Sequence, residues 1–318
     1  MPESPRGAGE ILLPAPETPA AIDLRETLRQ LRRLELRSRR LVDSRFSGEY
    51  HSVFKGQGLE FAEVREYVPG DDVRTIDWNV SARLGTPHVK RYTEEREMTV
   101  LLVADLSGSQ HFGTRTRNKV ERMIEVCAVL AFSAVRNNDR VGLLCFTDRV
   151  EAFLPPRQGR RHAMRLLRDL LVCRPAGRGT DPVPALELLP RVLASRSIVF
   201  LFSDFRLGQR RAGFERALAP LARRHDVVAV STRDPADRVL PDAGLVRLRD
   251  PESGEIVAAD TGSPATRRAF AEARAREEQW LEALFRRLGV DTIALRTETS
   301  PARDLLAFFR RREARAAR

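Results

Sequence analysis

The chain has 318 residues, of which 42% are hydrophobic and 31% are charged. These values are typical of a globular protein with one large α/β domain and a smaller unit. No stretch approaches the roughly 18–20 consecutive apolar residues that a membrane helix needs. The opening residues also lack the basic-then-apolar order of a secretory signal. We therefore expect a cytoplasmic protein without a membrane span.

The net charge of +11 raises the question of nucleic-acid binding, because basic patches attract phosphates. The arginines, however, are scattered among alanines and leucines, and only Lys55, Lys90 and Lys119 are lysines. Aromatic residues, on which single-stranded bases stack, do not alternate with the basic ones. We expect no nucleic-acid partner, and a nucleic-acid-binding module is the least favoured functional class.

The cysteines point to a reducing compartment. Cys127, Cys145 and Cys173 stand far apart in apolar surroundings and form no CxxC pair. Such residues are typical of a buried, reduced core in a cytosolic protein.

The first third of the chain divides into three segments. Residues 1–20 are rich in Pro, Gly, Ala and Glu without periodicity, which predicts a disordered leader. Residues 22–41 carry leucines at helical spacing and predict a helix. Residues 46–97 mix short apolar pieces with Gly and Pro, and we expect a small, loop-rich β unit packed against the main domain. The helix and this unit together form a predicted N-terminal region, residues 21–97.

Residues 98–318 alternate strand and helix, which predicts βαβ units and a mostly parallel open sheet with helices on both faces. Residues 150–154 follow a strand so closely that they predict an antiparallel edge. Residues 245–258, interrupted by Pro, Ser and Gly, predict an inserted hairpin. The expected strands are 98–104, 140–147, 197–203, 226–232 and 290–296, and the expected helices are 115–136, 160–173, 183–194, 209–224, 264–288 and 302–315.

A short cluster of oxygen-bearing side chains follows the first of these strands. Asp105, Ser107 and Ser109 occupy alternate positions directly after an apolar, β-branched run. Ligands bind beyond the carboxyl ends of strands in open α/β sheets, so Thr180 and Asp204 are expected at the same edge. Carboxylate and hydroxyl oxygens are hard ligands that suit Mg²⁺ or Mn²⁺. The five residues therefore predict a metal site with a coordination position open to a partner's carboxylate.

Each of these residues also has an ordinary structural explanation. Asp and Ser after a strand are common in turns and helix caps. Thr180, taken alone, is more often a helix-start residue, and Asp204 alone is more often a capping acid. An enzyme is the second functional class, because metal-dependent phosphoester hydrolases also place an aspartate after a strand. A haloacid-dehalogenase-like phosphatase needs a second acid two residues later, where this chain has Ser107.

The sequence resembles the domain-of-unknown-function family 58 from about residue 38 to residue 204. Matching residues lie both in the N-terminal region and around the second strand of the sheet. They are 56–61 (GQGLEF), 64–74 (VREYVPGDDVR), 76–79 (IDWN), 81–83 (SAR), 138–143 (NDRVGL), Pro155, Pro156, Gly159 and His162.

The resemblance implies a Rossmann-like fold of von Willebrand factor A type with a metal-ion-dependent adhesion site. In that site Ser107, Ser109 and Thr180 would bind Mg²⁺, and Asp105 and Asp204 would act directly or through water. It also implies a non-enzymatic adaptor or co-chaperone that works with a MoxR-type AAA+ ATPase and an acidic client protein. Many relatives carry membrane spans before the matching segment, and this sequence shows none there.

The charged part of the matching segment has two interpretations. Asp71, Asp72, Arg74, Asp77 and Arg83 are expected to form an ion network that fastens the β unit to the sheet, with Trp78 as its apolar anchor. The alternative is a surface on which a partner docks.

Overall fold

The computed structural model describes residues 24–42, 50, 59–94, 97–114 and 117–316. The predicted disordered leader, residues 1–20, lies outside the described residues. In the part of the chain that the structure describes, no helix combines the length and apolar character needed to cross a bilayer.

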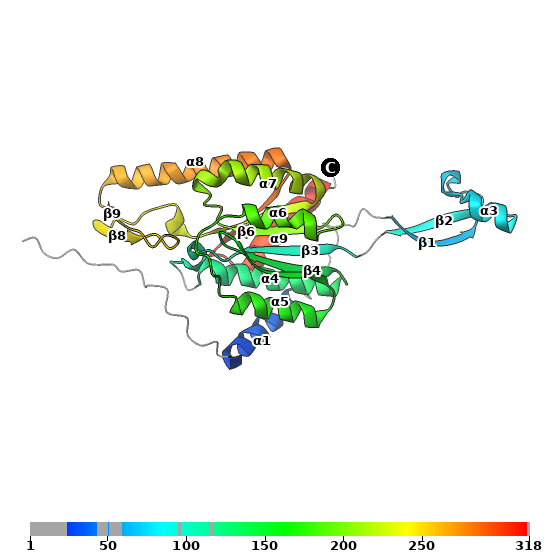
Figure 1. The fold of residues 1–318 in the computed structure, drawn as a ribbon, viewed down its shortest axis with the longest axis horizontal. Coiled ribbons are helices and arrows are strands. Elements are labelled where there is room, and N and C mark those ends of the chain that lie inside the picture. Colours follow the sequence, from blue (N-terminus) through cyan, green and yellow to red (C-terminus); the bar gives the residue numbers. More distant parts are fainter. Residues whose placement is uncertain (1–23, 43–49, 51–58, 95–96, 115–116, 317–318) are drawn as a thin grey trace, which may run out of the picture.

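A six-stranded sheet in the order β10-β7-β6-β3-β4-β5 forms the centre of the molecule (Figure 1). All neighbouring strands are parallel except β4 and β5, which are antiparallel as the sequence predicts. β5 borders the sheet and contains Pro155 and Pro156. The strands are β3 (Thr99–Asp105), β4 (Arg140–Phe146), β5 (Val150–Arg157), β6 (Ile198–Ser203), β7 (Asp226–Arg233) and β10 (Asp291–Arg296).

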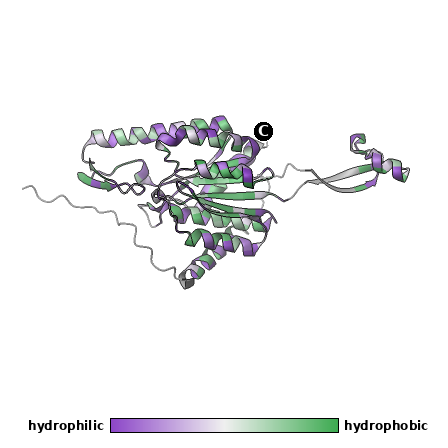
Figure 2. Cartoon of the chain, in the orientation of Figure 1, coloured by the Kyte–Doolittle hydropathy of each residue, from purple (hydrophilic) through white to green (hydrophobic). Residues whose placement is uncertain are grey.

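Both faces of the sheet are covered by helices, which explains why its central strands β3, β4 and β6 are largely apolar and buried along nearly their whole length (Figure 2). One layer contains α1 (Leu24–Leu41), α4 (Lys119–Arg136), α5 (Arg160–Val172) and α9 (Pro301–Ala316). The other contains α6 (Val183–Val192), α7 (Arg211–Arg224) and α8 (Pro264–Leu288). The predicted mostly parallel α/β sheet is therefore confirmed.

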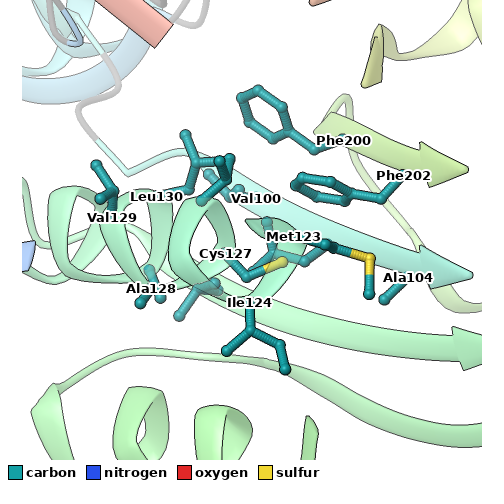
Figure 3. Packing of buried hydrophobic residues seen from close by; sticks show 14 of the residues in the cluster. Val100, Ala104, Met123, Ile124, Cys127, Ala128, Val129, Leu130, Phe200 and Phe202 are labelled. Atoms are coloured by element: carbon teal, nitrogen blue, oxygen red, sulfur yellow. The ribbon is translucent and has the colours of Figure 1, made fainter. Parts of the chain in front are cut away.

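Successive side chains of β3 point to opposite faces of the sheet and so belong to two different hydrophobic cores. Val100 and Ala104 belong to the cluster under α4, where Phe200 and Phe202 of β6 lie near Met123 (Figure 3). Leu101 and Val103 belong to the opposite cluster, under α6 and α7. β3 is thus buried on both sides, and its end is held in place by two packed layers.

The N-terminal region separates into two parts. Helix α1 packs against α4 and α5, and its Leu31 belongs to the buried cluster on that face, so α1 is part of the sheet domain. The sequence groups this helix with the β unit, whereas the structure joins it to the sheet. The β unit is an antiparallel pair, β1 (Leu59–Glu66) and β2 (His88–Glu94), connected through η2 (Val73–Thr75) and α3 (Trp78–Leu84). We call residues 59–94 the arm; in Figure 1 it extends away from the sheet.

The proposed anchoring role of Trp78 is wrong, because 70% of its surface is exposed. Asp71 accepts two hydrogen bonds from Arg65 within the arm, at 2.9 and 2.7 Å. Asp72 caps η2, and the side chain of Asp77 accepts from the first amides of α3. These contacts of the matching segment's acids organise the arm itself and do not fasten it to the sheet.

The inserted hairpin is also present where the sequence predicts it. Its strands are β8 (Leu245–Arg249) and β9 (Ile256–Asp260), which pair in an antiparallel ladder. The turn between them covers residues 250–255, and helix α8 follows β9.

Candidate functional site

The candidate site lies where the strand order reverses. From β3 the chain continues to β4 on one side, whereas β6 pairs with β3 on the other. Helix α4, which follows β3, and helix α7, which follows β6, pack against opposite faces of the sheet. Because the two connections diverge, the loops after β3 and β6 enclose a position between them, the usual place for a ligand in open α/β sheets.

The loop after β3 is held by the side chain of Asp105. Its Oδ1 accepts a hydrogen bond from the amide of Ser107 at 2.9 Å, and its Oδ2 accepts from the hydroxyl of Ser203 at 2.6 Å. The hydroxyl oxygens of Ser107 and Ser109 lie 3.1 Å apart. All three predicted residues of this loop are buried and grouped together.

Asp204 faces this loop from the end of β6. The side chain of Asp204 is 2% exposed, and Asp105 is fully buried. The Nζ of Lys119 lies 2.9 Å from Oδ2 of Asp204 and 2.9 Å from Oδ2 of Asp237. Arg206 also approaches Asp204, at 3.5 Å. Asp204 therefore belongs to a buried ion network as well as to the candidate site.

The two buried aspartates respond differently to their surroundings. Burial and the negative charge of Asp204 raise the pKa of Asp105 to about 7. Burial also acts to raise the pKa of Asp204, but the positive charges of Lys119 and Arg206 and the Ser109 hydroxyl outweigh it, and that pKa is lowered. Asp105 is thus the carboxylate whose charge lacks compensation.

Thr180 lies on the loop before α6, next to the first loop. The amide of Gly108 donates to the carbonyl of Arg178 at 2.9 Å, which joins the two loops. The Thr180 side chain is completely buried, and its hydroxyl donates to Glu252 at 2.5 Å. The structure therefore brings Asp105, Ser107, Ser109 and Asp204 together and places Thr180 beside them, bound to a carboxylate of the inserted hairpin.

The residues present fit a hard divalent cation. Among the described residues, no group of three or more His, Cys, Asp or Glu is arranged to hold a metal. Hydroxyl oxygens are also hard ligands for such a cation. Ser107, Ser109 and Thr180 offer such oxygens, and Asp105 offers a buried carboxylate whose raised pKa a nearby cation would lower. Asp204 already has Lys119 as a partner, which suits an indirect role.

Sequence reasoning missed four residues that shape the site: Lys119, Ser203, Asp237 and Glu252. Ser203 directly precedes the predicted ligand Asp204 at the end of the same strand. Its position in the sequence could therefore have identified it as a site residue. Lys119 is one of three lysines in a chain that otherwise uses arginine, which also marked it. Asp237 follows β7, and Glu252 lies in the turn between β8 and β9. No sequence pattern near either residue links it to the site.

Comparisons with known proteins identify the family of this chain. The family model described as "Protein of unknown function DUF58" matches residues 63–280. The chain is similar to "Uncharacterized protein Rv1480" of Mycobacterium tuberculosis, with 36% identity over 290 residues, or 90% of each chain. It is also similar to "Uncharacterized protein YeaD" of Bacillus subtilis, with 29% identity over 111 residues, or 35% of this chain and 26% of that protein.

Two solved structures are similar at low sequence identity. One is the conserved hypothetical protein BatB from Bacteroides thetaiotaomicron, with 14% identity, a TM-score of 0.42, and coverage of 69% of this chain and 99% of that one. The other is the SpRpn10 VWA domain, with 9% identity, a TM-score of 0.41, and coverage of 66% and 94%. From the family match and the relative in Mycobacterium tuberculosis, the chain belongs to the family of "Protein of unknown function DUF58", and its fold is an open, mostly parallel α/β sheet with helices on both faces.

Proposed function

We propose that this protein is a non-enzymatic, metal-dependent adaptor that binds partner proteins through the site at the end of β3. Ser107, Ser109 and Thr180 would hold Mg²⁺ or Mn²⁺, with Asp105 and Asp204 acting directly or through water. The bound ion would attract a carboxylate from a partner, because hard cations prefer oxygen ligands and exchange water for them. The grouping of buried hydroxyls around an uncompensated Asp105 is the observation that supports this proposal.

The proposed partners are a MoxR-type AAA+ ATPase and an acidic client protein, which the adaptor would bring together in the cytoplasm during maturation or assembly of client complexes. The family resemblance supports the ATPase, and the oxygen-rich site supports the acidic client. The three cysteines, all free in the structure, agree with a reducing compartment.

Metal binding is tested first, without any partner. Isothermal titration of Mg²⁺ into the full chain should show binding that the Asp105→Ala variant loses. The Asp169→Ala variant is the matched control, because Asp169 pairs with Arg168 on the surface of α5. Equal binding by the Asp105→Ala and unmodified chains would contradict the proposed site.

Partner binding is tested next, with a purified MoxR-type AAA+ ATPase. We expect it to bind the immobilised full chain in Mg²⁺ and to be released by a chelator. The Asp105→Ala chain should fail to retain the ATPase, whereas the Asp169→Ala chain should retain it. Retention that is insensitive to the chelator would contradict an ion-dependent contact.

A further inference from the structure

The turn of the inserted hairpin places a carboxylate on the candidate site. Oε1 of Glu252 accepts a hydrogen bond from the Thr180 hydroxyl at 2.5 Å, and Oε2 accepts one from the Thr180 amide at 3.1 Å. Both oxygens of Glu252 are therefore engaged by one residue, 72 positions away in the sequence. A carboxylate in this position lies beside a proposed metal ligand, where the acidic side chain of a partner would have to arrive.

The turn that carries Glu252 is internally organised. Oδ1 of Asp250 accepts from the amide of Glu252 at 2.8 Å, and the Asp250 carbonyl accepts from the amide of Gly254 at 2.8 Å. Gly254 has a φ of +75°, a conformation that favours glycine. Glu252 thus projects from a turn that its own hydrogen bonds define.

The same turn also touches the loop after β3. A Cβ atom at Gly108 would lie 2.3 Å from the carbonyl oxygen of Pro251, so only glycine at this position admits the turn. Gly108 stands between Ser107 and Ser109. The turn therefore contacts two of the loops that supply the proposed ligands, one at Gly108 and the other at Thr180.

The strands of the hairpin are largely exposed, as is most of its turn. Leu245, Ile256 and Val257 are exposed to 62%, 49% and 53%. Because little apolar surface holds these strands down, release of the turn from the site would cost few buried contacts.

We propose that Glu252 is an internal ligand, which occupies the position meant for a partner's carboxylate and keeps the site closed until a partner displaces it. This inference rests on the metal site proposed above. A bound ion would bring the Glu252 carboxylate into the coordination position that is otherwise open. A partner would then gain access only by competing with the chain's own hairpin, which makes binding selective for partners with a well-placed acidic side chain.

The test uses Tb³⁺ as a luminescent probe for hard-oxygen sites, bound to the full chain. Its excited-state lifetimes in H₂O and D₂O report how many waters remain on the ion. We expect Glu252→Gln and Glu252→Ala to carry about one more water than the unmodified chain, because the position vacated by the carboxylate fills with solvent. Glu255→Gln is the matched control, since Glu255 lies in the same turn and is exposed.

Acetate then serves as a free carboxylate. Acetate should remove the additional water from the Glu252 variants. The concentration needed for this should be about tenfold lower than the concentration at which acetate changes the water number of the unmodified chain. Equal water numbers and equal acetate responses in the unmodified, Glu252→Gln and Glu255→Gln chains would overturn the internal-ligand proposal while leaving the metal site intact. Failure of every chain to bind Tb³⁺ or Mg²⁺ would instead overturn the metal site, and the internal ligand with it.

Hydrogen exchange of the metal-free protein measures how strongly the contact between Glu252 and Thr180 stabilises the hairpin. The amides of residues 245–260 should exchange faster in the Glu252→Ala chain than in the Glu255→Gln chain, because the contact with Thr180 is lost. Identical exchange in these two chains would contradict the closing role of Glu252.

Discussion

The ammonium group of Lys119 and the carboxylate of Asp204 form a buried ion pair, with 2.9 Å between Nζ and Oδ2 and exposures of 1% and 2%. Lys119 begins α4 and Asp204 follows β6, so the pair joins the two connections that diverge at the site. Asp237 also contacts Lys119, and Arg206 contacts both acids, so Lys119 and Arg206 together compensate Asp204 and Asp237.

Removal of the Lys119 cation should destabilise the fold strongly. The Lys119→Met variant would leave Asp204 and Asp237 without their buried partner and with only the less buried Arg206, and breaking a buried pair typically costs about 3–5 kcal/mol. Urea unfolding measures the loss. The control is Arg140→Ala, whose pair with Glu97 is exposed to 56% and 45% and should contribute about 0–1 kcal/mol. Similar losses in both variants would contradict the structural role of Lys119.

The stability of the metal-free protein should depend on the protonation of Asp105. Its pKa is raised from 3.8 to about 7, so between these values the folded chain holds a proton that the unfolded chain releases. The free energy of unfolding therefore falls as pH rises from about 4 to about 7, by at most about 1.4 kcal/mol per pH unit from this group.

The Asp105→Asn variant removes this dependence. Its stability relative to the unmodified chain should increase between pH 5 and pH 8 in a chelator, as measured by urea unfolding. Addition of Mg²⁺ at pH 8 should stabilise the unmodified chain alone. Parallel pH profiles for the two chains would contradict the raised pKa of Asp105.

The loop that carries Thr180 should be sensitive to one added methyl group. A Cβ atom at Gly177 would lie 2.2 Å from the Thr147 hydroxyl oxygen and 2.1 Å from Oδ1 of Asp148. Gly177→Ala should therefore displace the loop, cost about 1–3 kcal/mol of stability and weaken Mg²⁺ binding in titration. Gly179→Ala is the control from the same loop, because its nearest neighbours would lie at 3.7 and 3.9 Å. Equal Mg²⁺ affinity in the two variants would show that the position of Thr180 is unimportant.

Trp78 should contribute little to the stability of the fold. With 70% of its surface exposed, Trp78→Ala should change the free energy of unfolding by no more than about 0.5 kcal/mol. Phe202→Ala, which empties a fully buried position, should cost about 3–5 kcal/mol. A large loss on removal of Trp78 would restore the anchoring role that its exposure contradicts.

The sheet was predictable because its signals are local. Residues 98–104 form an apolar run, and such a run with a polar end marks both a buried strand and the loop that follows it. The same logic placed Asp204 at this edge, since the carboxyl ends of parallel strands meet there. Thr180 lies between α5 and α6, and the hydrogen bond from Gly108 to Arg178 joins its loop to the site.

Contacts between distant segments could not be derived in this way. Glu252 reaches Thr180 only because the hairpin folds back across the site, and the sequence of the hairpin reveals its turn but not its destination. Trp78 was misjudged for a related reason: a large aromatic side chain usually marks a core, but here it lies on a helix of the arm that leaves it exposed.

Strand β5 limits how another chain could join this sheet. Pro155 and Pro156 have no amide hydrogen, and successive amides of a strand point to opposite sides, so one donor is missing on the outer side. An irregularity in the pairing of β5 with β4 falls at the same place. This border therefore resists sheet extension by a second copy or an extended peptide, which protects the protein from edge-to-edge aggregation.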